Sequence, residues 1–140
     1  MNRDIRFRGL RVDGKGWACG SLVIERERPG RTAHFIVDGD GLYLLVKPDT
    51  VGQLWKKDCE GVDMYSGDKV SVHQFLFDGN EIEEESIAIV GTNEDGFTLE
   101  FISGDFVKRH TGEDNPICMA TDVYGLHEES FKIIGNIHSK

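Results

Sequence analysis

Residues 69–102 read KVSVHQFLFDGNEIEEESIAIVGTNEDGFTLEFI, and this stretch decides the fold class. Two Asp-Gly pairs, Asp78-Gly79 and Asp95-Gly96, separate three runs rich in β-branched and aromatic residues. Asp-Gly suits the centre of a type I′ turn, because both central positions need positive φ and glycine adopts it without strain. The stretch therefore predicts three strands, near 69–77, 81–90 and 97–102, joined by two hairpin turns.

The middle run shows a change of apolar face. Its early acidic residues, Glu83 and Glu85, share one parity with the later Ile87 and Ile89. Such a change within one strand predicts a bulge or a bend. The acidic residues also predict that the first part of this run is a solvated edge, kept from pairing by like charge.

Further Asp-Gly pairs extend the hairpin pattern towards the amino terminus. These pairs are Asp13-Gly14, Asp38-Gly39 and Asp40-Gly41, and they stand among apolar runs near 17–24, 33–37 and 42–46. One more apolar run lies near the carboxyl terminus, at 131–137. A charged segment at 25–30 is typical of a turn. Helical pattern is limited to short pieces after Pro48 and near 121–130. We predict a mainly β, hairpin-rich domain with few short helices, of the kind that closes into barrels or sandwiches.

Length and composition fit one domain. The 140 residues, 39% of them apolar, suffice for a core without disulfide or metal support. We expect a single domain over 1–140, with 1–50 as a candidate N-terminal β subdomain and 51–140 as a barrel-like part. The three cysteines form no close pair and indicate free thiols in a reducing compartment; they are Cys19, Cys59 and Cys118.

No segment of the sequence is typical of membrane insertion or secretion. No apolar run approaches the roughly 18–20 residues that span a bilayer, and the first residues lack a signal-peptide pattern. We therefore expect a cytoplasmic protein that has no membrane partner.

Charge is distributed unevenly along the chain. The net charge is −9, but residues 1–32 hold eight Lys and Arg against four Asp and Glu, whereas residues 33–140 hold eight against 21. A basic end on an acidic body indicates contact with nucleic acid, or attraction between the two parts within a chain or between subunits.

Catalytic and metal-binding signatures are missing from the sequence. No phosphate loop, dinucleotide fingerprint or serine-hydrolase motif occurs. No short zinc-binding unit is formed by the five histidines, His34, His73, His110, His127 and His138. We therefore expect no cofactor and no metal, and an enzyme only if its site is assembled from distant strands.

The aromatic residues fall mostly in predicted strands, where core packing is their expected role. A stacking platform for single-stranded bases is the alternative, but an acidic body repels phosphates. One turn is more specific: Gly67-Asp68 stands directly before the alternating run that begins at Lys69. The Asp can accept hydrogen bonds from nearby amides while the Gly turns the chain. Small SH3-like barrels commonly begin a strand in this way, which predicts an SH3-like, barrel-type C-terminal part.

Three segments resemble the YopX family, whose members are encoded mainly by bacteriophages and prophages. They are IRFR at 5–8 with the later Trp17 and Gly20, then VGQ at 51–53 with KDCEGVDMYSGDKV at 57–70, and finally IIGNI at 133–137. Order and spacing agree with the family over nearly the whole chain. By this resemblance the structural motif positions are Phe7, Trp17, Gly52, Gln53, Gly61, Tyr65, Gly67, Asp68, Val70, Gly135 and Asn136.

The chain departs from the family pattern at a few positions. LWK at 54–56 replaces a longer Tyr-Thr-Gly-Leu segment, and Ser66 and Lys69 stand where the family has Glu and Ile. The resemblance implies a β-rich fold with a barrel-like carboxyl part and a bacterial or phage cytosolic setting. It implies no activity, because none is established for the family.

These observations favour a non-catalytic accessory protein that binds another macromolecule or assembles with itself. Nucleic-acid binding through the basic N-terminal strands is the first alternative, and an enzyme with a site assembled from distant strands is the second. The candidate partner-binding residues are the basic residues of the N-terminal third and one tryptophan that we predict to be exposed: Arg6, Arg8, Arg26, Arg28, Arg31 and Trp55.

Overall fold

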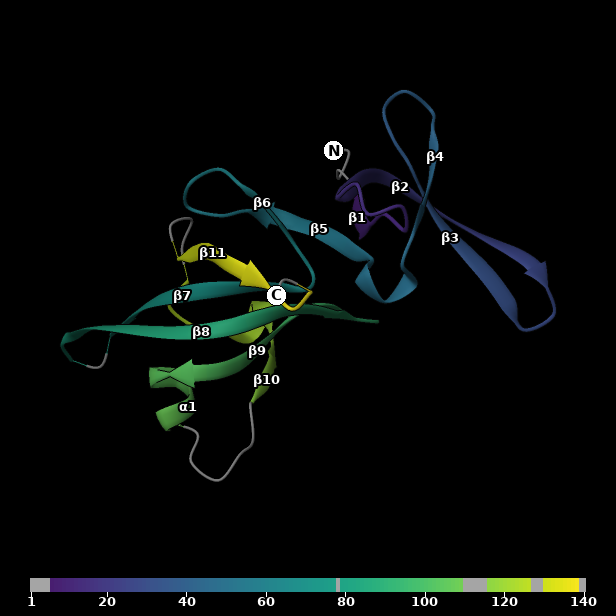
Figure 1. The fold of residues 1–140 in the computed structure, drawn as a ribbon. Helices are drawn as coiled ribbons and strands as arrows, with labels where there is room; N and C mark the ends of the chain where they lie inside the picture. The colour runs from purple at the N-terminus through teal and green to yellow at the C-terminus, as the bar shows by residue number, and fades with distance from the viewer. Residues whose placement is uncertain (1–5, 78, 110–115, 127–129, 139–140) are drawn as a thin grey trace. The chain divides into compact units, whose positions relative to one another are not determined.

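The computed structural model describes residues 6–77, 79–109, 116–126 and 130–138. It consists of two compact units, of which the first ends at Leu54 and the second begins at Trp55. Figure 1 draws both units as ribbons. The mainly β prediction is confirmed, because almost all regular structure is in antiparallel strands.

Unit 1 is a curled antiparallel sheet. Its strands are β1 (Phe7–Leu10), β2 (Trp17–Arg28), β3 (Arg31–Val37) and β4 (Tyr43–Val46), with the 3₁₀ helix η1 (Pro48–Thr50) leading to the start of β5 (Gly52–Lys57). The strand order is β4-β3-β2-β1-β5. The helical piece predicted after Pro48 is this single 3₁₀ turn. A small core of Ala18, Ile36 and Val46 lies on one face of the sheet.

The curl brings the chain after β1 against β4. Arg11 forms an isolated bridge with Val46, and the amide of Val12 donates to the carbonyl of Leu45 at 3.0 Å. Gly9 faces Val46 so closely that a Cβ at position 9 would lie 2.9 Å from the valine Cβ. Since real Cβ atoms do not approach that closely, only glycine fits at position 9.

Unit 2 is a five-stranded antiparallel sheet with small additions. Its elements are the end of β5, β6 (Asp63–Tyr65), β7 (Asp68–Phe77), β8 (Glu81–Asn93), β9 (Gly96–Gly104), α1 (Asp105–Arg109), β10 (Ile117–Met119), η2 (Ala120–Asp122) and β11 (Phe131–Asn136). The sheet order is β10-β9-β8-β7-β11, whereas β6 pairs with β5. The core holds twelve buried apolar residues among the described ones, including Phe101 stacked on Phe106 with ring centroids 3.8 Å apart.

The predicted run of three strands at 69–102 is β7, β8 and β9. The sequence pattern predicts a bulge or a bend within β8, but β8 keeps one alternation of inward and outward residues. A register shift between β8 and β9 does lie beside its middle. Ile87 pairs with Ser103 and Ala88 with Phe101, so the extra residue is Ile102 on β9. The bulge therefore lies in the neighbouring strand.

The unit 2 sheet does not close into a barrel over the described residues. β10 and β11 remain the two ends of the unit 2 sheet, and β10 has only three residues. The barrel-type C-terminal part is thus replaced by an open sheet. Of the helical stretch predicted at 121–130, only η2 is present, and residues 127–129 lie outside the described ones. Asp78 of one predicted turn also lies outside them.

Candidate partner-binding arm

The hairpin of β2 and β3 extends beyond the rest of the unit 1 sheet, as Figure 1 shows. β1 pairs with β2 only over residues 17–20, and β4 pairs with β3 only over residues 34–37. Residues 25–33 therefore pair only with each other in the described structure. Every residue from 24 to 32 is exposed. We call residues 24–33 the arginine arm.

The register of the arm sets its charges. Arg26 lies opposite Thr32, and Arg28 lies opposite Arg31, with a register shift between Arg26 and Arg28. Gly30, at φ +79°, makes the tight turn at the tip. Like charges directly opposite on two strands repel. The Arg28–Arg31 pair therefore costs stability in the free protein unless an anion neutralises it.

One glutamate neutralises the arm in part. The Arg31 Nε lies 3.3 Å from a carboxylate oxygen of Glu27, an exposed pair of the kind that contributes little stability. Within the described residues, Arg26 and Arg28 have no ion-pair partner. Beside them Ile24 is 55% exposed. The arm thus presents two unneutralised guanidinium groups next to an exposed apolar side chain.

Two of the predicted arginines lie elsewhere in unit 1. The carbonyl of Arg6 accepts a hydrogen bond from the amide of Leu54 at 2.7 Å. The guanidinium of Arg8 lies 4.5 Å from the ring centroid of Trp17, a cation–π contact that contributes about 0.5–1 kcal/mol at an exposed site. Arg26, Arg28 and Arg31 are therefore the predicted arginines that the fold brings together.

Trp55 corrects an expectation, because we predicted it to be exposed. It is partly buried against the unit 2 core, stacked on Phe97 at 5.6 Å and edge-on to Phe131 at 5.1 Å between ring centroids. Burying these faces removes apolar area from water, and no periodicity in the short LWK segment marks that role. Trp55 is therefore a packing residue of unit 2.

A second hairpin, in unit 2, carries the opposite charge. Glu81, Glu83 and Glu85 alternate along the first part of β8, where β9 pairs only from Ser86 onward. Phe77, on β7 opposite Glu81, is 82% exposed. We call residues 73–77 and 81–85 the glutamate hairpin. It agrees with the prediction of a solvated acidic edge.

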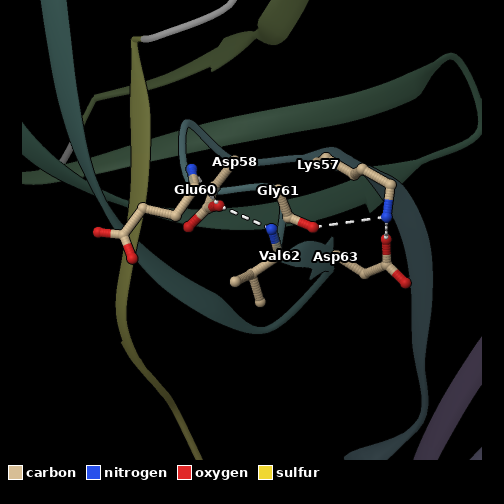
Figure 2. Close-up of polar contacts among 6 residues, drawn as sticks. All are labelled: Lys57, Asp58, Glu60, Gly61, Val62 and Asp63. Atoms are coloured by element: carbon tan, nitrogen blue, oxygen red, sulfur yellow. Dashed lines mark hydrogen bonds and ion pairs between the residues drawn. The ribbon is translucent and has the colours of Figure 1, made fainter.

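Asp58 holds the loop between β5 and β6 in place (Figure 2). One carboxylate oxygen accepts hydrogen bonds from the amides of Glu60 and Val62, both at 2.9 Å, and the other accepts one from Ile133 at 3.1 Å. Burial of Asp58, 7% exposed, would by itself raise the pKa of this carboxyl. The three amides and nearby Lys132 outweigh burial and lower the pKa below its usual value. Asp58 is therefore a structural anchor that ties the loop to β11.

The motif positions of the first resembling segments meet in unit 1. Phe7 pairs with Gln53 on one side and with Gly20 on the other. Arg8 pairs with Gly52, and Trp17 lies under the Arg8 guanidinium. These residues thus join β1, β2 and β5.

The remaining motif positions meet in unit 2. Asp68, 1% exposed, accepts a hydrogen bond from the amide of Tyr65 at 2.8 Å, and Gly67 adopts φ +97°. Between β7 and β11, Asp68 pairs with Asn136 and Val70 pairs with Ile133. The strand register shifts by one residue next to Gly135. Gly61, at φ +81°, turns the Asp58 loop. The contacts described at these positions are strand pairing, turn geometry and one hydrogen bond to a buried carboxylate.

The histidine, cysteine and carboxylate residues of the described part of the chain do not gather into a metal site. No group of three His, Cys, Asp or Glu residues there lies close enough to hold a metal ion; His110 and His127 fall outside that part. None of the helices described is long and apolar enough to cross a bilayer.

Comparison of the chain with protein-family models, with curated proteins and with solved structures gave no match.

Proposed function

We propose that this protein is a non-catalytic binding module that assembles with itself, the arginine arm of one copy docking on the glutamate hairpin of another. The observation that carries the proposal is the arm itself. It is a two-stranded ribbon with all of residues 24–32 exposed and with Arg26 and Arg28 unneutralised.

A free ribbon of this kind is poorly stable. Two strands without a third strand or a packed face are at best marginally stable in water. The arm also exposes Ile24 and sets Arg28 opposite Arg31. A partner that supplies carboxylates and apolar surface would relieve all three costs at once, since guanidinium and carboxylate groups form strong paired hydrogen bonds.

The chain itself supplies such a partner surface. Residues 1–54 hold nine Lys and Arg against seven Asp and Glu, a balance of +2, whereas residues 55–140 hold seven against 18, a balance of −11. The glutamate hairpin adds the exposed Phe77 to its carboxylates. Opposite potentials steer association and fix its register. An arm-to-hairpin contact joins two different surfaces, so it is head-to-tail and builds rings or chains of copies.

A charge-swap experiment tests the proposal. Variant A carries Arg26→Glu and Arg28→Glu, and variant B carries Glu81→Arg and Glu83→Arg. By sedimentation velocity at low salt the wild type should form oligomers that dissociate as salt is added. Variants A and B should each be monomeric, and an equimolar mixture of the two should associate again because each arm then meets a hairpin of opposite charge.

Matched controls separate the contact from net charge. The first control combines Lys15→Glu with Lys47→Glu, two exposed residues of unit 1 away from the arm. The second combines Glu94→Arg with Asp122→Arg, two exposed residues of unit 2 away from the hairpin. Both should keep the wild-type mass. A monomeric wild type at low salt, or a mixture of A and B that stays monomeric, would overturn self-assembly. Salt-sensitive duplex binding that is lost in variant A alone would support the nucleic-acid alternative instead.

We also propose that the chain is a YopX-like accessory protein of a phage or prophage and acts in the bacterial cytoplasm. What supports this is the resemblance of its three segments, whose motif residues pair directly in the fold. Sequencing the genomic neighbourhood of the gene tests it: phage genes on both sides are expected, and a setting without any would contradict it.

A further inference from the structure

The glutamate hairpin has one open strand edge, and the register of the sheet shows which residues lie on it. Neighbouring residues of an antiparallel strand point their backbone N–H and C=O groups to opposite sides. The amide of His73 donates to the carbonyl of Ser130 at 2.7 Å, on the β11 side of β7. The next residue, Gln74, therefore points to β8, where it pairs with Glu84. It follows that Glu84 points to β7 and that Glu83 points to the opposite edge of β8.

That opposite edge is open at Glu81 and Glu83. β9 pairs with β8 only from Ser86 onward, and the amide of Glu85 already donates to a carboxylate oxygen of Asp105 at 3.0 Å. Within the described residues, β7 is the strand that pairs with Glu81 and Glu83, and no strand pairs with them on the other side. Both residues are exposed, so an incoming strand can reach their edge.

The arginine arm has an open edge of matching length. The amide of Asp38 donates to the chain just before β4, so by alternation Ala33 points to β2, where it pairs with Glu25. The residues on either side of Glu25 are Ile24 and Arg26, and they point to the other edge of β2. β1 pairs with β2 only as far as residue 20. In the described part of the chain, this edge is therefore open at both residues.

The two open edges complement each other in spacing and in charge. Each presents two residues that are two positions apart, so an antiparallel pairing sets Arg26 opposite Glu81 and Ile24 opposite Glu83. Side chains directly opposite lie on the same face, where unlike charges attract and like charges repel. Two glutamate hairpins therefore resist pairing with each other, and so do two arginine arms. Charge thus selects the pairing of an arm with a hairpin.

We propose that the arm of one copy docks by adding a strand to the hairpin of another, with residues 24–26 of β2 antiparallel to residues 81–83 of β8. Each facing pair exchanges two backbone hydrogen bonds. The inference rests on the proposed self-assembly and adds a backbone contact to the contact between charges. Strand addition of this kind is a known mode of recognition at open sheet edges, and it makes each two-stranded ribbon part of a larger and more stable sheet.

Amide hydrogen exchange, read residue by residue, tests the pairing. The assembled wild type at low salt is compared with variant A, which has an unchanged hairpin but should be monomeric. The amides of Glu81 and Glu83 should exchange at least about tenfold more slowly in the wild type, because they gain hydrogen bonds. The amides of Ile82 and Glu84 point to β7 in both proteins and should change less. Docking through side chains alone predicts no such alternation, and its absence would overturn the strand pairing.

A pair of substitutions at one position separates the backbone from the charge. Glu83→Pro removes the edge N–H and the carboxylate, whereas Glu83→Gln removes only the carboxylate charge. Proline is tolerated at an edge whose N–H does not serve the sheet. In sedimentation velocity the dissociation constant of Glu83→Pro should exceed that of Glu83→Gln by about tenfold. Equal dissociation constants would contradict the strand pairing. The exchange measurement uses neither variant, so it holds even if Glu83→Pro does not fold.

The outcomes also separate this inference from the proposed function. Oligomers that obey the charge swap between variants A and B but show no alternating protection would support self-assembly and overturn the strand pairing. A wild type that stays monomeric at low salt would overturn both.

Discussion

The two units differ sharply in how they use apolar residues. Over the described residues, the core of unit 1 contains three buried apolar residues and that of unit 2 contains twelve. Both units leave large apolar side chains exposed, so the contrast lies in the cores. Among the described residues these exposed side chains are Val12, Ile24, Leu42, Tyr43 and Leu45 in unit 1, and Val62, Phe77, Ile82, Ile117, Tyr124, Ile134 and Ile137 in unit 2. Burying one large apolar side chain contributes about 1.5–3 kcal/mol. Unit 2 therefore carries most of the hydrophobic stabilisation, and unit 1 has a much smaller core.

Each unit contains one tryptophan that can report on it. Trp17 lies in β2 of unit 1, and Trp55 packs in unit 2. Replacing either by phenylalanine leaves a fluorescence signal from the other unit alone, so chemical denaturation of the two single-tryptophan proteins compares the units directly.

The largest effect is expected from the unit 2 core. Phe101→Ala should lower the free energy of unfolding reported by Trp55 by about 3–5 kcal/mol, because it leaves a cavity against Phe106. Phe101 is fully buried. The control Phe77→Ala truncates an exposed ring and should change that free energy by less than about 0.5 kcal/mol. Equal effects of the two substitutions would contradict the assignment of the core.

Ile36→Ala tests the same comparison by destabilising unit 1. Ile36 is fully buried in unit 1, and its truncation should cost about 2–4 kcal/mol. The Trp17 transition should move to lower denaturant concentration while the Trp55 transition stays in place. If both transitions move together, the units unfold as one body and the contrast between them fails.

Asp58→Asn should cost about 2–3 kcal/mol near neutral pH. An asparagine side chain has one oxygen in place of the two carboxylate oxygens, so it cannot accept hydrogen bonds from all three backbone amides. In either orientation its NH2 group faces at least one backbone N–H, and two donors then oppose each other. Asp63 is partly exposed and pairs with Lys57 at 2.9 Å; it gives the control Asp63→Asn, for which less than about 0.5 kcal/mol is expected.

The same variant has a defined pH dependence. The folded pKa of Asp58 lies below the usual value, so the unfolded chain takes up the proton first as pH falls. The stabilisation by Asp58 is complete above the unfolded pKa and is lost as pH falls through the folded pKa. The difference in unfolding free energy between wild type and Asp58→Asn should therefore be largest near neutral pH and shrink below about pH 4. A constant difference over this range would contradict the lowered pKa.

The smallest effect is expected at the glycines. Gly61 adopts φ +81° with open space around it, so Gly61→Ala should cost only the backbone strain of about 1 kcal/mol. Gly39 is also in open space but has no positive φ, and Gly39→Ala should be neutral or slightly stabilising. A larger loss at Gly39 than at Gly61 would show that φ is not the cause. Thermal unfolding measures both.

The strands were predictable where turn chemistry and alternation coincide. Asp95-Gly96 between apolar runs locates the β8–β9 hairpin, and Gly96 adopts φ +136° there. β6 and β10, of three residues each, and the helix α1 carry no periodic signal of their own, and their formation depends on contacts distant in sequence.

The arm was only half predictable. Its arginines were identified from composition, but the segment at 25–30 was predicted to be a turn, whereas β2 continues to Arg28 and only Pro29-Gly30 form the turn. The alternation of glutamate and arginine at 25–28 is typical of a loop, because no apolar residue there marks one face of a strand as buried.

The contact between Gly9 and Val46 has an evolutionary consequence. Two positions 37 residues apart in the sequence share one small volume, with 2.9 Å between a hypothetical Cβ and the valine Cβ. A mutation that adds a side chain at position 9 is tolerated only after position 46 has lost bulk, for example as glycine. In homologous sequences the two positions should therefore change in a fixed order, with the smaller residue at position 46 appearing before the larger residue at position 9. Any homologue with a side chain at position 9 should carry a smaller residue than valine at position 46.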